Sequence, residues 1–179
     1  MPTQDMDLAP RRVDAGMPDY SDPGGDDFVA LARDRIPVRS MREDDLAAIV
    51  RIDRRYTGRE RNAYYQRKLK EVLSESGIRV SLVAEHDGLP VGYVMARVDY
   101  GEFGRTEPAA VIDTIGVAPD FAHHGVGQAL LSQLFANLAG LHVETVRSTV
   151  KWDNFGLLRF LRGVGFQPAQ RLVLTRPVT

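Results

Sequence analysis

The feature that most constrains the fold is the stretch of residues 111–131, which reads VIDTIGVAPDFAHHGVGQALL. It begins with strand-forming residues, passes through a polar loop and reaches two glycines, Gly125 and Gly127, at the start of an apolar helix. Amide groups at a helix N-terminus point outward without partners, at the positive end of the helix dipole, so they suit a pyrophosphate. The stretch therefore predicts a strand, a phosphate-binding loop and a helix in one unit.

Two familiar nucleotide motifs are excluded at this loop. A Walker A site requires Lys and Ser or Thr after the second glycine, where this chain has Gln128 and Ala129. A dinucleotide fingerprint requires a third glycine where Leu130 stands. Two glycines alone are a weak signal, since a tight loop with close helix packing also needs them. The surrounding elements must distinguish a phosphate-binding loop from a loop that is tight only for packing.

Those elements predict a single α/β domain over residues 36–179. Strands are expected at residues 36–39, 78–85, 91–100, 109–117, 143–151 and 172–174. Helices are expected after a capping box formed by Ser40 and Glu43, and over residues 60–76, 125–138 and 154–163. The resulting order, β-α-α-β-β-β-α-β-α-β, favours a mixed, mainly antiparallel central sheet flanked by helices.

Residues 1–35 differ in composition from the rest of the chain. They hold eight Asp against four Arg, together with four Pro. So little apolar surface predicts a flexible N-terminal arm, in which Phe28, Val29 and Leu31 are the residues able to dock on the domain or on a partner subunit.

Composition excludes several classes of function. The formal net charge is −1, which argues against a nucleic-acid partner. The chain has no cysteine, so disulfides, a thiolate nucleophile and cysteine-based metal sites are excluded, and no metal is expected. No apolar run is long enough to cross a membrane and no signal peptide is visible, so we expect no membrane partner and a cytoplasmic location.

Two motifs together resemble the GNAT superfamily of acyl-CoA dependent N-acetyltransferases. The first is IGVAP at residues 115–119 followed by GVGQALL at residues 125–131. The second is NFGLLRFL at residues 154–161, closed by GVGF at residues 163–166. Their separation and the order of elements match that family, and the resemblance covers about residues 36–175.

The resemblance implies a site for acetyl-CoA. A substrate thioester would lie in a V-shaped gap between the strand of Ile115 and the strand of Ser148, with its pantetheine arm pairing like an added strand. A bulge at Gly116 would free amides near Ile115 and Val117, although a glycine there is also explained by packing space. The pyrophosphate would lie on the backbone of residues 123–128, and Asn154 would lie near the pantetheine or the sulfur. The implied cofactor-binding residues are Ile115, Gly116, Val117, His123, His124, Gly125, Val126, Gly127, Gln128 and Asn154.

This chain departs from the family pattern at two positions. Ala122 stands where the family usually has Arg or Gln, and His124 is the residue that could partly replace that cation. Leu161 stands where many relatives carry a tyrosine that protonates the leaving thiolate.

Three side chains are candidates to accept the proton of the attacking amine, namely Asp113, Glu107 and His123. Alternation would place Asp113 on one strand face with Val111, Ile115 and Val117, among apolar neighbours that would make it a better base. Direct loss of the proton to water through Thr114 or Ser148 is the alternative.

The expected function is transfer of an acetyl group from acetyl-CoA to a primary amine of a small molecule, peptide or protein. The alternative is a non-catalytic, acyl-CoA-binding regulatory module. A homodimer is expected because members of the family commonly form one and because the N-terminal arm could wrap around a second copy. Arg54, Arg55, Arg59 and Arg61 either attract an acidic acceptor or form a solvated helix face, and Trp152 and Tyr100 either shape the acceptor pocket or belong to the core.

Overall fold

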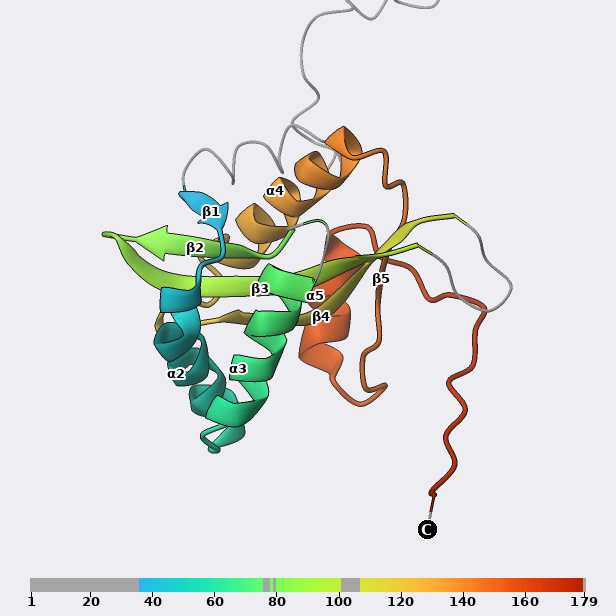
Figure 1. The fold of residues 1–179 in the computed structure, drawn as a ribbon, viewed down its shortest axis with the longest axis horizontal. Helices are drawn as coiled ribbons and strands as arrows, with labels where there is room; N and C mark the ends of the chain where they lie inside the picture. Colours follow the sequence, from blue (N-terminus) through green and yellow to red (C-terminus); the bar gives the residue numbers. More distant parts are fainter. Residues whose placement is uncertain (1–35, 76–77, 79, 101–106, 179) are drawn as a thin grey trace, which may run out of the picture.

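A computed structural model describes residues 36–75, 78, 80–100 and 107–178 of the chain (Figure 1). The predicted N-terminal arm, residues 101–106 of the link before the fourth strand, and Gly77, the expected end of the second helix, lie outside the described residues.

The centre of the molecule is a five-stranded sheet with neighbours in the order β1-β2-β3-β4-β5. The strands are β1 (Val38–Ser40), β2 (Leu82–His86), β3 (Leu89–Asp99), β4 (Ala109–Val117) and β5 (Val146–Ser148). β1 to β4 pair antiparallel, and β5 alone runs parallel to its neighbour. The predicted mixed, mainly antiparallel sheet is confirmed.

Helices cover both faces of this sheet (Figure 1). One face carries α2 (Leu46–Thr57), which follows the 3₁₀ turn η1 (Glu43–Asp45), and α3 (Asn62–Lys70), which continues into the π turn η2 (Glu71–Glu75). The other face carries α4 (Val126–Gly140), preceded by the 3₁₀ turn η3 (Pro119–Phe121), and α5 (Phe155–Gly163).

The core divides at the sheet because successive strand residues point to opposite faces. Val94 and Ala96 of β3 pack under α4, whereas Tyr93 and Met95 pack against α2 and α3. The helix expected over residues 125–138 forms as α4, and Val126, Leu130, Leu134 and Leu138 on one side of it are buried. Leu141 follows the helix and is exposed.

The predicted capping box at Ser40 and Glu43 is wrong. Ser40 is the last residue of β1, and the amide of Arg42 donates instead to Oδ2 of Asp45 (2.7 Å). The same carboxylate binds Arg39 through both terminal nitrogens (2.7 and 2.8 Å). A buried carboxylate with an arginine partner therefore starts the first helix, rather than a surface hydroxyl.

The predicted last strand at residues 172–174 does not form. No helix or strand follows α5 up to Val178, and every residue of 167–178 is exposed. A strand exists only where its backbone groups find a partner strand, and none lies beside this segment in the part of the chain that the structure describes.

Candidate active site

The candidate site begins where β4 and β5 separate. Their pairing is limited to Ala110 with Val146, Val111 with Arg147 and Ile112 with Ser148. The hydroxyl of Ser148 donates to the carbonyl of Ile112 (3.1 Å) at the last of these pairs. β5 ends at Ser148, whereas β4 continues through residues 113–117 without a further strand partner on this side among the described residues. We call the opening beside this part of β4 the divergence.

The free edge of β4 presents backbone groups at Ile115 and Val117. The amide of Ala118 donates to the carbonyl of Val91 (2.7 Å), so these two residues form a hydrogen-bonded pair of the antiparallel ladder. Such pairs alternate with pairs whose N–H and C=O groups point away from the partner strand. Val117 and Ile115, which lie opposite Gly92 and Val94, therefore direct their backbone groups into the divergence.

The loop after β4 delivers the chain to the N-terminus of α4. His123 and Gly125 both have positive φ, 62° and 81°, and Gly125 is the residue type that adopts this conformation without strain. The first amide of this helix with a backbone acceptor is that of Ala129, which donates to Gly125 (2.9 Å). Within the described residues, the amides of Val126, Gly127 and Gln128 have no acceptor and remain available to an anion.

Close packing explains why glycine occupies two positions of the predicted site. A Cβ on Gly127 would lie 2.9 Å from Cζ of Phe160 in α5, so glycine here lets two helices approach. A Cβ on Gly116 would lie 2.7 Å from Cε1 of Tyr93 across the ladder. The bulge expected at Gly116 lies instead at Asp113, because Thr114 pairs with Met95 and Ile112 with Ala96.

We expected Asp113 to lie among apolar side chains, and this expectation is wrong. The extra residue of the bulge places it on the opposite face from Ile115 and Val117, which pack toward α4. Its Oδ2 lies 3.2 Å from Nζ of Lys68 in α3 and 3.4 Å from Nε of Arg97 in β3. The side chain is 13% exposed, so Asp113 is a mostly buried carboxylate between two cations.

Lys68 also donates to Glu71 (3.0 Å). Burial acts to lower the pKa of the Lys68 ammonium, but Glu71 and Asp113 together raise it above its ordinary value. Lys68 therefore remains charged beside Asp113.

The other two predicted proton acceptors lie apart from Asp113. Glu107 is exposed and precedes β4, whereas His123 is exposed in the loop that follows it. A strand of nine residues spans about 30 Å. The structure therefore does not bring Asp113, Glu107 and His123 together at one reacting group.

The second motif has structural roles in this chain. Oδ1 of Asn154 accepts from the amide of Leu157 (3.2 Å) and so caps α5. Leu161, at the position of the family tyrosine, is 6% exposed and packs into the core under α4. His124 is exposed, and Trp152 and Tyr100 are 83% and 65% exposed rather than core residues.

Two residues at the end of α2 contact the site. Arg55 is one of the four arginines that the sequence singled out, but neither its partner nor the contact of Tyr56 was predicted. The hydroxyl of Tyr56 donates to the carbonyl of Val117 (2.5 Å), which faces the divergence, and burial raises the pKa of this phenol. Arg55 pairs with Asp120 of the loop (3.3 Å). No sequence signal identifies these contacts, because they join segments about 60 residues apart.

A buried polar network supports β4 from behind Gly116. Asp53 of α2 accepts from Arg61 and from the hydroxyl of Tyr65 (2.9 Å), and the hydroxyls of Tyr65 and Tyr93 are 2.9 Å apart. Burial acts to raise the pKa of Asp53, but hydrogen bonds from Arg61 and Tyr65 hold it below its ordinary value. The network fixes the Tyr93 ring against Gly116.

The described part of the chain offers neither a metal-binding cluster nor a membrane-spanning helix. No group of three or more His, Asp or Glu side chains there is arranged to hold a metal ion. Among the helices described, none has the length and apolar character needed to span a bilayer.

Comparison with known protein families identifies a family for this chain. The model of the acetyltransferase (GNAT) family matches residues 44–166, which include both motifs and the divergence of β4 and β5. No curated protein matches the chain in sequence.

Solved structures share the fold at low sequence identity. An aminoglycoside N-acetyltransferase, AAC(6')-Iy, in complex with CoA has a TM-score of 0.67 and 19% identity, over 79% of this chain and 94% of that chain. A transcriptional regulator from Bacillus halodurans C-125 has a TM-score of 0.67 and 19% identity, over 80% and 99%. The ribosomal-protein-S18-alanine N-acetyltransferase from Escherichia coli has a TM-score of 0.62 and 20% identity, over 75% and 79%.

Proposed function

The chain belongs to the acetyltransferase (GNAT) family, and we propose that it transfers an acetyl group from acetyl-CoA to a primary amine of a small molecule, a peptide or a protein. The observation that carries this proposal is the edge of β4 at Ile115 and Val117, which has no strand partner on this side among the described residues and leads directly to the unpaired amides of α4. The Val117 carbonyl accepts from Tyr56 and keeps a second lone pair for a further donor. An edge of this kind accepts an extended, amide-containing arm as it would accept a strand.

In this proposal the chain binds acetyl-CoA through its backbone. The N–H and C=O groups of Ile115 and Val117 pair with the two amides of the pantetheine arm, and the amides of residues 126–128 hold the diphosphate. Acetyl-CoA supplies the activated acetyl group as a thioester. No cationic side chain is required at Ala122, because the helix dipole and three unpaired amides already favour an anion.

The chemistry requires positioning and one proton transfer. The neutral amine attacks the thioester carbon, a C–N bond forms as the C–S bond breaks, and the amine proton is lost while CoA leaves as the thiol. Of the three side chains predicted to accept a proton, Asp113 alone lies on the part of β4 that borders the divergence. We therefore assign proton acceptance to Asp113, with Lys68 and Arg97 holding its carboxylate in place.

The proposal is tested by thiol release from acetyl-CoA over a panel of amines. The panel includes aminoglycosides and a peptide with N-terminal alanine, because enzymes of similar fold act on such amines. The chain has no cysteine, so every thiol that a reagent detects comes from CoA. Release above the rate in buffer, dependent on one amine, supports the proposal.

A separate measurement tests binding. CoA at 100 times its dissociation constant should stabilise the fold by about 2.7 kcal/mol, seen as a rise in melting temperature. No shift at millimolar CoA contradicts the assignment of the site.

A second candidate is a regulatory module that binds acyl-CoA without turnover. Leu161, buried where relatives carry a tyrosine acid, favours it, and a transcriptional regulator shares the fold. Stabilisation by CoA with no thiol release from any amine would select this alternative.

A further inference from the structure

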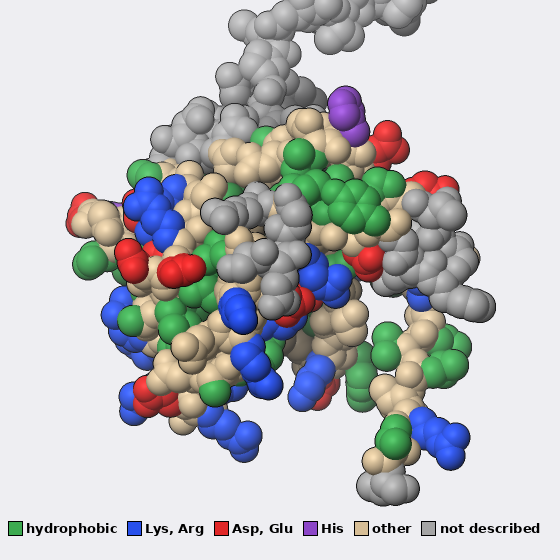
Figure 2. Space-filling model, in the orientation of Figure 1, with side chains coloured by type: hydrophobic (Ala, Val, Ile, Leu, Met, Phe, Trp, Pro, Cys, Tyr) green, Lys and Arg blue, Asp and Glu red, His purple; other side chains and the backbone are tan. Residues whose placement is uncertain are grey.

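The helices α2 and α3 carry a dense group of cationic side chains. Residues 46–70, which form these helices and the link between them, contain eight Lys and Arg but only two Asp and Glu. The whole chain, in contrast, has a formal net charge of −1. Figure 2 shows blue Lys and Arg side chains across the lower part of the view, where Figure 1 places α2 and α3. This face of the molecule is therefore far more positive than the chain as a whole.

Half of the eight cations have carboxylate partners. The pairs are Arg54 with Glu60, Arg55 with Asp120, Arg61 with Asp53, and Lys68 with Glu71 and Asp113. The other four cations are exposed, and within the described residues they form no ion pair: Arg51, Arg59, Arg67 and Lys70. Four positive charges are therefore left for a partner of opposite charge.

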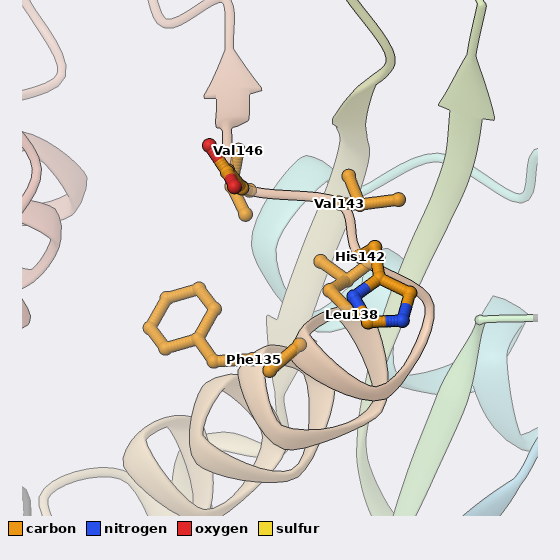
Figure 3. A pocket seen from close by; sticks show the side chains of 7 residues that line it. Phe135, Leu138, His142, Val143 and Val146 are labelled. Carbon is orange, nitrogen blue, oxygen red and sulfur yellow. The ribbon is translucent and has the colours of Figure 1, made fainter.

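The opposite face of the sheet is different in character. α4, the longer of the two helices on that face, contains no charged residue. A cavity of about 380 Å³ beside α4 is lined mainly by apolar side chains, among them Phe135, Leu138 and Val146 (Figure 3). The excess of positive charge therefore lies mainly on the face that carries α2 and α3.

The cationic face borders the proposed site of reaction. Asp113, to which we assign proton acceptance, points to this face, and its Oδ2 lies 3.2 Å from Nζ of Lys68 in α3. The end of α2 reaches the edge of β4, where Tyr56 donates to the carbonyl of Val117. An amine that loses its proton to Asp113 must therefore approach along α2 and α3, past the exposed cations.

We propose that the acceptor is an acidic polypeptide, whose carboxylates lie along α2 and α3 while its amine reaches the divergence. Four exposed cations attract such a chain, raise its rate of association and repel a polycation. A polypeptide supplies a basic primary amine, which a nucleic acid of similar charge does not. The proposal rests on the proposed function for the fate of the amine, but binding of the acidic chain to this surface is measurable without turnover.

Three peptides test the proposal. They share an N-terminal alanine and differ at the positions that follow, which carry glutamate, glutamine or arginine. Thiol release from acetyl-CoA gives kcat/KM for each peptide, and fluorescence anisotropy of peptides labelled at the C-terminus, with CoA present, gives the dissociation constants. The wild type at low salt should favour the glutamate peptide about 10-fold over the glutamine peptide and bind the arginine peptide least. At about 1 M salt, where the screening length is about 3 Å, this preference should disappear.

Substitutions locate the preference on the surface. Arg67→Gln with Lys70→Gln alters α3, and Arg51→Gln with Arg59→Gln alters α2 and the link. All four side chains are exposed and glutamine is a good helix former, so these variants should keep the fold. Each pair of substitutions should lower the preference for the glutamate peptide about 3-fold, and the four together should abolish it.

The matched control removes two exposed cations from α5. Arg159→Gln with Arg162→Gln should keep the wild-type preference, because α5 lies on the other face of the sheet. Equal binding of the three peptides, or a preference that survives all four substitutions, overturns the proposal even where thiol release supports the proposed function. A preference in binding that the four substitutions abolish supports the proposal, and if no peptide then releases thiol, the proposed function alone fails. Tighter binding of a single-stranded oligonucleotide than of the glutamate peptide also overturns the proposal.

Discussion

Asp53 shows how one buried carboxylate connects α2 and α3 to the site. It joins Arg61 and Tyr65, and through Tyr65 it reaches Tyr93, whose ring lies on Gly116. The partners of Asp53 lie 8 and 12 residues further along the chain, beyond the reach of a helical pattern, so the sequence could not predict this network.

The stability of this network should depend on pH. Because the folded-state pKa of Asp53 lies below its ordinary value of about 3.9, its contribution is fully present above that ordinary value and is lost as the pH falls through the folded-state pKa. Asp53→Asn should lower the free energy of unfolding at pH 7 by about 1–3 kcal/mol. This is less than for a fully buried pair, since Arg61 is 40% exposed.

Denaturant titrations measure the free energies of unfolding of the wild type and of Asp53→Asn. The difference between the two should become smaller as the pH approaches 2. Asp120→Asn, which removes an exposed carboxylate paired with Arg55, is the control and should change stability little at any pH. A loss for Asp53→Asn that is the same at pH 7 and pH 2 would contradict the charge-dependent role.

Asp113 is the second residue whose role can be tested directly. Asp113→Asn should lower turnover by about 10² to 10⁴ fold and leave CoA affinity nearly unchanged, because proton transfer is lost while the backbone groups of Ile115 and Val117 remain. Steady-state kinetics across pH and CoA titration measure the two effects. The rise of the rate with pH should change with the substitution, because a general base accepts a proton only in its unprotonated form.

Glu107→Gln and His123→Asn are matched controls, and asparagine tolerates the positive φ at position 123. Both should retain turnover. If Asp113→Asn lowers the melting temperature but keeps the wild-type pH–rate profile, Asp113 has only a structural role, through its ion pairs with Lys68 and Arg97.

At the scale of elements, the sequence predicted β4 at residues 109–117, where the structure has it. Strand-forming residues there are bounded by prolines at positions 108 and 119, so the local sequence is sufficient to predict this strand and its ends. The bulge at Asp113 was not predictable, because it depends on how β4 aligns with β3. The strand at residues 172–174 was predicted from its apolar residues alone, and without a partner it does not form.

The contact between α4 and α5 gives a test at this scale. Gly127→Ala should destabilise the fold by up to about 2 kcal/mol, because crowding against Phe160 costs about 1–3 kcal/mol and the better helix propensity of alanine returns about 1 kcal/mol. In a Phe160→Leu background the same substitution should become stabilising.

Thermal unfolding of the four variants of this cycle measures the coupling between positions 127 and 160. Gly140→Ala, whose Cβ would meet nothing within 4 Å, is the control in the same helix and should not destabilise. Equal effects of Gly127→Ala in the wild-type and Phe160→Leu backgrounds would show that the two helices do not clash there.

For the whole molecule, the composition of the N-terminal arm leads to a test. Residues 1–33 carry neither motif and little apolar surface. Deleting them should therefore leave a folded domain with unchanged CoA affinity. Circular dichroism and CoA titration of the shortened chain measure this, and loss of either property would show that the arm belongs to the core or to the site.

The hydrogen bond from Tyr56 to Val117 joins the end of α2 to the strand edge that we propose binds CoA. Val117 offers its carbonyl to the divergence, and Tyr56 belongs to the helix that covers the opposite face of the sheet. An amine that displaces the end of α2 must change the affinity for CoA, and CoA must change the affinity for that amine by the same factor. The dissociation constant of one ligand, measured with and without the other, therefore reports on both affinities.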